Sequence, residues 1–421
     1  MGRLRVLVIA EACNPGWASV PLVGYNFTAA LAERPDLDVT VCTQVRNRPN
    51  LAADPINARA EVVYLDTEWV AAPFHRLGQR LVGRRGGGWT TGTAVGWPSY
   101  LAFEHQLYGR FAADFRRGRF DLIHRVTPLT PTYPSPLAAM TRVPMLAGPL
   151  NGGLPWPKAY PDLRRQEREW LVPVRRAYRS LPYFRQTYRH LAGVIAGSRH
   201  TATEVPGWFH GKRYYLPENG IDPGRFPLAA GWPEPAGRFT IASVGRLVPY
   251  KGFDLLLEAV AGSRPLRGCR VVIAGDGPER GRLEGYARQE GLTGVEFAGW
   301  QEQAAVGRLL AASQVFAFPS LREFGGAVAL EAMAAGAVPA VVDYGGPGEL
   351  VGDAGVRVPL RPRAELVADL RAALERLLAD PAECRRLGRL AVERVRTEFT
   401  WAAKAGRLVE IYHDLLSARR S

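Results

Sequence analysis

The chain has 421 residues, of which 47% are hydrophobic and 22% are charged, so it can build folded cores and is not a disordered protein. This length predicts two domains or three. The formal net charge of +14 favours an anionic partner, such as a phosphorylated substrate, an anionic membrane surface or nucleic acid.

The cysteine spacing and the apolar runs exclude several classes of protein. None of the four cysteines forms a Cys-x-x-Cys pair, so neither a zinc site nor a redox pair is predicted. The first apolar run stops at Glu11, which is too short for a signal peptide. No uncharged apolar stretch approaches the ~18 residues of a transmembrane helix. We therefore expect a cytoplasmic protein, with peripheral attachment to the inner face of the membrane as an option.

Strand-like and helix-like patterns alternate through the first half of the chain. This alternation predicts a parallel, doubly wound sheet. Residues 66–98 show little periodicity and are expected to form a loop or an insertion. Strands are expected at 4–10, 38–43, 62–65, 121–124, 144–147 and 193–196, and helices over 21–33, over 100–117 and from residue 198.

Residues 155–190 have an unusual composition, with nine basic residues, three acidic residues and seven aromatic residues. We expect one or two helices here. One interpretation is a solvated arginine face whose aromatic side chains turn to the core. The other is a surface that meets anionic lipid. The residues alone leave both open.

The second half repeats the alternation after a linker rich in Pro and Gly at 223–237. Helices are expected between the strands, and three helical segments close the chain, the last over 401–417. The fold class is therefore α/β, with two Rossmann-like halves and a cleft between them. The expected strands are 240–245, 270–274, 295–298, 315–319 and 338–342.

Two cations follow the strand expected at 240–245. Arg246 offers a planar fork for phosphate oxygens, and Lys251 offers a mobile point charge. Ligands of open α/β sheets bind beyond the carboxyl ends of the strands. The pair therefore suits a diphosphate, although two solvated loop cations would give the same pattern.

A glycine-bearing loop at 320–326 opens a helix that carries two carboxylates. The glycines allow close backbone approach, and the helix N-terminus favours an anion. Glu323 precedes this end and Glu331 lies about two turns later; both are acceptors suited to sugar hydroxyls. The alternative is a helix with a dipole-stabilised Glu and an exposed Glu. Because apolar residues flank Glu331, we expect it to be buried with a partner.

Together these motifs resemble the family-4 retaining glycosyltransferases of the GT-B fold. The matching segments are GRL and KG within 245–252, GDGP at 275–278, the Glu323/Glu331 pair with EAMAAG, NGID at 219–222 and FTW at 399–401. EFGG at 323–326 and YGGPGELV at 344–351 resemble one subgroup. No Gly-x-Gly-x-x-Gly follows the first strand, which counts against a nicotinamide dehydrogenase.

The resemblance implies two Rossmann-like domains that face each other across a cleft. Residues 1–218 would form the acceptor-side domain, residues 219–400 the domain that binds the nucleotide-sugar donor, and residues 401–421 a helix that crosses back to the first domain. The implied reaction moves a hexose from a nucleotide diphosphate sugar to an acceptor hydroxyl with retention of configuration. Synthesis of a cell-surface polysaccharide or a glycolipid is the expected setting.

The resemblance also implies roles for individual residues. Arg246 and Lys251 would hold the donor diphosphate and neutralise the leaving group. Glu331 would bind the ribose hydroxyls, and Glu323 would contact the donor sugar. No metal and no cofactor are implied, and a UDP-sugar is slightly favoured over GDP-mannose. The remaining donor-binding positions are Gly245, Gly277, Pro278, Phe324, Gly325 and Gly326.

The acceptor side departs from the subgroup in two places. Its first loop often reads C-x-P-G-x-G-S-E, whereas here a Gly and the acidic residue are missing around Gly16 and Ser19. His124 matches the first His of a frequent H-x-H motif, but Val126 stands at the second. A catalytic His124 and a satisfied strand-end histidine are both open. A second Gly-rich loop facing the cleft is expected at Asn151, Gly152 and Gly153.

The expected partners are the nucleotide sugar and an acceptor. The acceptor would be a lipid-linked glycan or polysaccharide at an anionic membrane, or a phosphorylated soluble molecule. A non-catalytic or regulatory sugar-nucleotide-binding protein is the alternative function. A nucleic-acid partner is not expected because no such motif is visible. An isomerase of nucleotide sugars would want a nicotinamide site, which is not evident.

Overall fold

The computed structural model describes residues 2–73, 89–166, 178–180 and 182–417, and it divides the chain into two compact units. Unit 1 comprises Met1–Gly152, Glu169–Glu218 and Lys404–Ser421, and unit 2 comprises Gly153–Arg168 and Asn219–Ala403. One division falls after residue 218, where the sequence places a domain boundary. Residues 153–168 differ from that expectation, because they pack with unit 2 although both flanking segments belong to unit 1.

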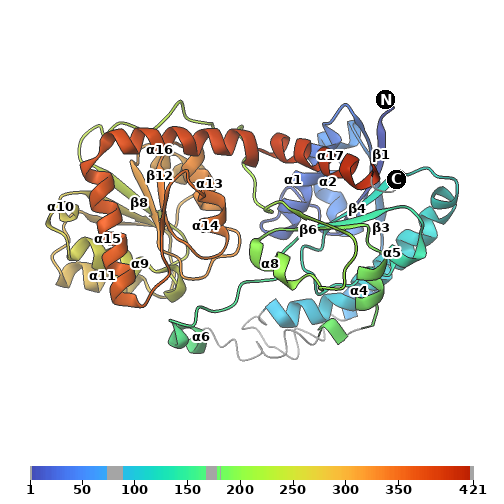
Figure 1. The fold of residues 1–421 in the computed structure, drawn as a ribbon, viewed down its shortest axis with the longest axis horizontal. Coiled ribbons are helices and arrows are strands. Elements are labelled where there is room, and N and C mark those ends of the chain that lie inside the picture. The colour runs from blue at the N-terminus through green and yellow to red at the C-terminus, as the bar shows by residue number, and fades with distance from the viewer. Residues whose placement is uncertain (1, 74–88, 167–177, 181, 418–421) are drawn as a thin grey trace. The chain divides into compact units, whose positions relative to one another are not determined.

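Unit 1 is built on a parallel sheet that, within the described residues, has seven strands in the order β3-β2-β1-β4-β5-β6-β7 (Figure 1). The order reverses between β1 and β4, the usual ligand position of a doubly wound sheet. The strands are β1 (Leu4–Ala10), β2 (Leu37–Gln44), β3 (Glu61–Leu65), β4 (Leu122–Thr127), β5 (Met145–Leu150), β6 (Gly193–Ala196) and β7 (Lys212–Tyr215).

Helix α4 (Trp89–Arg116) covers one face of this sheet. Phe103, Leu107 and Phe111 recur at helical spacing and are fully buried against the strands. The expectation of a loop or an insertion over 66–98 was wrong for residues 68–73 and 89–98, which are helical, and residues 74–88 lie outside the described residues. Further helices of unit 1 include α1 (Val20–Ala32), α2 (Arg48–Leu51), α5 (Leu137–Met140), α7 (Phe184–His190), α8 (Arg199–Glu204) and α17 (Trp401–Ser417), with short 3₁₀ turns η1 (Val45–Asn47) and η2 (Pro55–Ala58).

Unit 2 contains a second parallel sheet, with the strand order β10-β9-β8-β11-β12-β13 in the described part of the chain. Its order reverses between β8 and β11. The strands are β8 (Thr240–Val244), β9 (Arg270–Ala274), β10 (Val295–Gly299), β11 (Val315–Phe318), β12 (Val338–Val342) and β13 (Val356–Val358). The helices are α6 (Pro161–Gln166), α9 (Phe253–Ala261), α10 (Arg264–Arg267), α11 (Arg280–Gln289), α12 (Gln303–Ala311), α13 (Ala327–Ala334), α14 (Gly346–Val351), α15 (Arg363–Ala379) and α16 (Pro381–Arg394), with the 3₁₀ turn η5 (Pro249–Lys251) and the π-helical turn η6 (Val395–Phe399).

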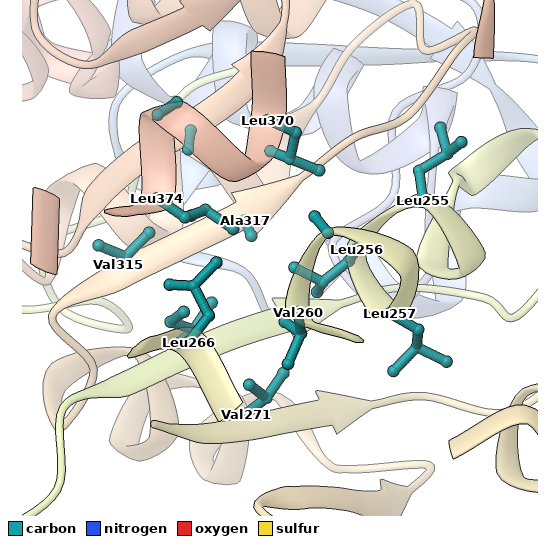
Figure 2. Close-up of a cluster of buried hydrophobic side chains, with 14 of the residues drawn as sticks. Leu255, Leu256, Leu257, Val260, Leu266, Val271, Val315, Ala317, Leu370 and Leu374 are labelled. Carbon is teal, nitrogen blue, oxygen red and sulfur yellow. The ribbon is translucent and has the colours of Figure 1, made fainter. Parts of the chain in front are cut away.

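Alternate residues of the unit 2 strands enter two hydrophobic cores. Val315 and Ala317 of β11 face α9 and α15, whereas Phe316 and Phe318 face α12 and α13. Figure 2 shows part of the first core, which includes Leu256 and Val260 of α9 and Leu370 and Leu374 of α15. Each fully buried leucine contributes roughly 1.5–3 kcal/mol. Both faces are covered, which is typical of a parallel sheet and fixes the loops at its carboxyl edge.

Short or exposed strands were the ones that the sequence missed. β7 alternates half-buried and exposed residues, and β13 has three residues.

All four cysteines are buried free thiols. Among the described residues, no helix combines the length and apolar character needed to cross a bilayer.

Candidate functional site

The candidate donor residues lie in loops at the carboxyl ends of the unit 2 strands. Arg246 and Lys251 follow β8, Glu323 follows β11, and these two strands are neighbours at the point where the strand order reverses. Gly277 and Pro278 follow β9. The topology therefore gathers most of the predicted donor residues at one edge of one sheet.

The loop after β8 is held by close backbone contacts. Gly252 has φ of 70° and caps the N-terminus of α9, and a Cβ there would lie 2.2 Å from the Pro319 carbonyl oxygen. Only glycine fits both the left-handed backbone and this approach. Gly252 thus keeps the Lys251 loop against the loop that carries Glu323.

Lys251 and Glu323 form an ion pair, with Nζ donating to Oε2 of the carboxylate. Their side chains are 15% and 20% exposed, so the pair is largely shielded from water. Nζ also lies 5.0 Å from the centroid of the Phe318 ring, within cation–π range. The structure therefore brings together two of the predicted catalytic side chains.

The β11–α13 loop presents backbone amides at a helix N-terminus. Gly326, with φ of 64°, caps α13, and the amides of Phe324, Gly325 and Gly326 have no backbone acceptor among the described residues. A backbone hydrogen bond from the start of α14 holds this loop in place, because the Gly346 amide donates to the Glu323 carbonyl at 3.0 Å. Free amides at a helix start form a ready anion-binding position.

Glu331 lies on α13 between the buried residues Leu330 and Ala332 and is itself half-buried, so it is less enclosed than the sequence predicted. Burial raises the pKa of its carboxyl to about 7, against the smaller opposing effect of a hydrogen bond with Gln303. Gln303 begins α12, so Glu331 faces the loop that follows β10. A half-buried carboxyl with one protein partner retains acceptor capacity for ligand hydroxyls.

A pocket of about 480 Å³ opens beside these loops. Exposed Arg246 lines it together with Gly245 from the same loop. Gly275 belongs to the β9 loop, and its Cβ would lie 1.9 Å from the Gly245 carbonyl oxygen, so the two loops touch through their backbones. The pocket is lined by Val244, Gly245, Arg246, Ala274, Gly275, Asp276, Trp300, Gln301 and Val306.

Trp156 supports the ion pair from a segment that the sequence did not connect with the donor site. Its ring lies 4.4 Å from the Arg322 guanidinium and meets the Tyr250 ring edge-on at 6.1 Å. Arg322 precedes Glu323, and Tyr250 precedes Lys251. The Arg322 Nε also donates to the Leu154 carbonyl at 2.8 Å. No sequence spacing links residue 156 to residues 250 and 322.

In unit 1, Gly16 and Ser19 lie in the loop that joins β1 to α1. The Gly16 amide donates to the Asn14 side chain at 2.9 Å. Ser19 has φ of 66°, which is strained for a non-glycine residue, and its exposed hydroxyl does not cap α1. A strained residue with an unused hydroxyl at the carboxyl edge of a sheet is consistent with the predicted acceptor loop.

The second predicted acceptor loop follows β5. The Asn151 side chain donates to Glu218 at 3.1 Å, and the Gly152 amide donates to the Thr201 hydroxyl at 3.0 Å. Gly153 falls in unit 2, and Gly152 ends the first segment of unit 1. The loop is therefore also the connection through which the chain enters the Trp156 segment.

His124 is completely buried in β4. Its Nε2 lies 2.8 Å from the Gly148 carbonyl and its Nδ1 lies 2.6 Å from the Tyr412 hydroxyl. A carbonyl only accepts, so Nε2 carries the proton and Nδ1 accepts from Tyr412. Burial lowers the pKa of the ring to about 4, although the bond to Gly148 opposes this. The geometry favours the interpretation of a satisfied structural histidine at the end of a strand, in which His124 binds α17 through Tyr412.

The aromatic residues of 155–190 that the structure describes mostly pack inward. Trp156 contacts Arg322, and Tyr160, Phe184 and Tyr188 are buried. Tyr183 is 40% exposed. Trp170 lies outside the described residues. The described part therefore favours the interpretation of a solvated arginine face over aromatics turned to the core.

Residues that the sequence reasoning missed include Trp156, Arg322, Trp300 and Gln301. For Trp300 the usable signal was a tryptophan just after the end of a predicted strand. In the structure Trp300 lines the pocket and is 71% exposed. In the described part of the chain, no three His, Cys, Asp or Glu side chains group as metal ligands would.

Comparison with known proteins finds a similarity between most of unit 2 and one family. Residues 227–394 match the family Glycosyl transferases group 1. Glycogen synthase from Mycobacterium tuberculosis is 35% identical over 207 residues, which cover 48% of each chain, so the present chain spans about half the length of this relative.

Solved structures resemble the whole chain. Sucrose-phosphate synthase from Thermosynechococcus elongatus has a TM-score of 0.62 at 21% identity and covers 99% of this chain and 100% of its own. HepE from Anabaena, in complex with UDP, has a TM-score of 0.59 at 17% identity, covering 98% and 100%. The two Rossmann-like units thus have the GT-B fold, as predicted.

Proposed function

We propose that this chain, whose residues 227–394 match the family Glycosyl transferases group 1, transfers a hexose from a nucleotide diphosphate sugar to an acceptor hydroxyl. The observation that carries the proposal is the Lys251–Glu323 ion pair beside the free amides that begin α13. The cation and the unpaired N–H groups at this sheet edge suit the anionic diphosphate, and the carboxylate beside them suits the hydroxyls of the sugar.

The donor would bind with its diphosphate between Arg246, Lys251 and the amides of Phe324, Gly325 and Gly326. Glu331 would accept hydrogen bonds from the ribose, and Glu323 from the donor sugar. Gly245, Gly277 and Pro278 would line the nucleoside side. A UDP-sugar is favoured, which agrees with the UDP held by the structurally similar HepE. The acceptor would meet Gly16, Ser19 and the loop at 151–153.

The proposed reaction keeps the anomeric configuration. The bond from the anomeric carbon to the leaving diphosphate oxygen breaks as the acceptor hydroxyl attacks from the same face. The departing phosphate oxygen takes the acceptor proton. Arg246 and Lys251 stabilise the negative charge that develops on this leaving group, and the loops hold the reactants in position.

The acceptor belongs, in this proposal, to polysaccharide or glycolipid synthesis at the inner face of a membrane. The net charge of +14 supports an anionic surface as the place of encounter.

Thermal-shift measurements across nucleotides and nucleotide sugars test the donor proposal, because a ligand that binds only the folded state raises the melting temperature. The predicted donor raises it and is then consumed in an assay with mixed acceptors. Binding without hydrolysis or transfer would support the non-catalytic alternative. Absence of any shift with every nucleotide diphosphate sugar would contradict both.

A further inference from the structure

A second pocket, of about 560 Å³, lies in unit 1 at the opposite end of its sheet from the acceptor loops. Its walls come from the segments that lead into three adjacent strands, namely Arg142–Val143 before β5, Arg189–Ala192 before β6 and His210–Gly211 before β7. The acceptor loops follow the carboxyl ends of strands, so this pocket at their amino ends is a separate feature of the unit.

The rim of the pocket is basic. Arg142, Arg189, His190 and His210 line it, and none of them forms an ion pair with another described residue. The Nδ1 atom of His190 lies 2.8 Å from the Gln186 carbonyl, so the Nε2 atom is the one that can bind a ligand. Lys212 also lines the pocket, but its Nζ is paired with the Asp414 carboxylate at 2.7 Å, and the Tyr214 hydroxyl donates to the same carboxylate at 2.6 Å.

The floor of the pocket is apolar and fixed. Ala138, Leu191 and Leu415 are buried, and they come from α5, from the residue that follows α7 and from α17. These positions pack in the body of unit 1, whereas Arg142 and Arg189 are exposed and line the same pocket. Two guanidinium groups at one pocket can grip phosphate oxygens bidentately.

We propose that this pocket binds a phosphate group. The helix dipole explains why cations are tolerated in the last turn of α7, but it does not explain Arg142 and His210, which come from other segments. The phosphate belongs either to a small soluble molecule or to a lipid headgroup, and the chemistry of recognition is the same for both. The proposal does not depend on the donor site.

The test compares two charge-matched double variants of the full chain. Arg142→Glu with Arg189→Glu removes the two forks, and Arg116→Glu with Arg117→Glu makes the same charge change at the exposed end of α4. Calorimetry with inorganic phosphate measures binding directly. The wild type and the α4 variant should bind phosphate at this pocket with the same affinity. In the pocket variant, the affinity for phosphate at this site should fall about tenfold or more.

Vesicles of phosphatidylcholine with and without phosphatidic acid form the second arm. Loss of phosphatidic-acid-dependent co-sedimentation in the pocket variant alone identifies a lipid headgroup as the source. Unchanged or absent vesicle binding, with phosphate binding lost, identifies a soluble phosphate. Equal phosphate and vesicle binding by the pocket variant and the α4 variant would overturn the proposal, as would a wild type that binds neither probe.

Discussion

Trp156 and Arg322 stack on each other, with 4.4 Å between the guanidinium carbon and the ring centroid. Arg322 adjoins Glu323, and the second neighbour of the indole, Tyr250, adjoins Lys251. One side chain therefore buttresses both halves of the ion pair on which the donor proposal rests. Trp156 belongs to residues 153–168, which pack with unit 2 although the segments before and after them in the sequence belong to unit 1.

Replacement of Trp156 tests this support. Trp156→Ala should raise KM for the donor and lower kcat about tenfold or more, because a loosened loop misplaces the Lys251–Glu323 pair. Trp156→Phe should restore most of the activity, since a ring still faces Arg322. Steady-state kinetics measure both. The control is Trp69→Ala, at a residue 70% exposed in unit 1; equal losses in the two alanine variants would remove the positioning role.

Glu331 should make stability depend on pH. Its pKa in the folded chain is about 7, above the ordinary value of 4.5, so the unfolded chain loses this proton first as pH rises. Stability is therefore lost between about pH 4.5 and 7, by up to ~3 kcal/mol. Glu331→Gln should melt at a higher temperature than the wild type at pH 8, and the difference should shrink toward pH 4.5. A difference that does not change with pH would contradict the raised pKa of this carboxyl.

The Glu331→Gln variant should also bind the donor more weakly. Ribose hydroxyls stabilise the ionised carboxylate, so wild-type affinity for a nucleotide diphosphate should rise as pH increases toward and through about 7. Glu331→Gln should bind more weakly above this pH, and its affinity should vary less with pH. Titration calorimetry at several pH values measures the difference, and parallel pH profiles would refute the ribose contact.

His124 should matter for stability and little for turnover. Its pKa of about 4 lies below the ordinary 6.5, so the unfolded chain takes up a proton first as pH falls, and stability is lost between about pH 6.5 and 4. Tyr412→Phe removes its hydrogen-bond partner and should cost ~1–3 kcal/mol while kcat stays within about twofold. Thermal melts and kinetics check both. A large loss of kcat with an unchanged melt would restore a catalytic role.

Gly275 should tolerate no side chain. Its φ is 145°, and a Cβ would lie 1.9 Å from the Gly245 carbonyl oxygen, so Gly275→Ala must push apart the two loops that line the pocket of about 480 Å³ beside Arg246. We expect a loss of nucleotide binding together with a lower melting temperature. Gly285→Ala in α11 is the control, because only the tip of Arg288 lies near, at 4.0 Å, and it should be neutral or stabilising by ~1 kcal/mol.

The strands that are buried on both faces could be predicted from the sequence. β6, β9 and β12 have the expected bounds, because continuous apolar runs between turns have few other solutions. β7 was not predicted, since an edge strand that begins with half-buried Lys212 and exposed Arg213 lacks that pattern. The first eleven residues of α4, at 89–99, were not predicted as helix because glycine and threonine weaken the helical signal there.

The candidate site divides in the same way. Arg246, Lys251 and Glu323 were predictable because each follows a recognisable strand, and topology alone brings such loops together. Trp156 was not predictable, since its contacts depend on a segment that crosses to the other unit in mid-sequence. The burial of His124 depends on α17, which lies almost three hundred positions away.

The central claim is that Arg246 and Lys251 hold a sugar diphosphate, and Arg246→Ala tests it most directly. Arg264→Ala, at an exposed position on α10, is the matched control. Turnover of the donor identified by thermal shift should fall about 10²–10³-fold in Arg246→Ala, with an unchanged melting temperature, and should stay at the wild-type rate in Arg264→Ala. Equal turnover in the two variants would contradict the proposed function.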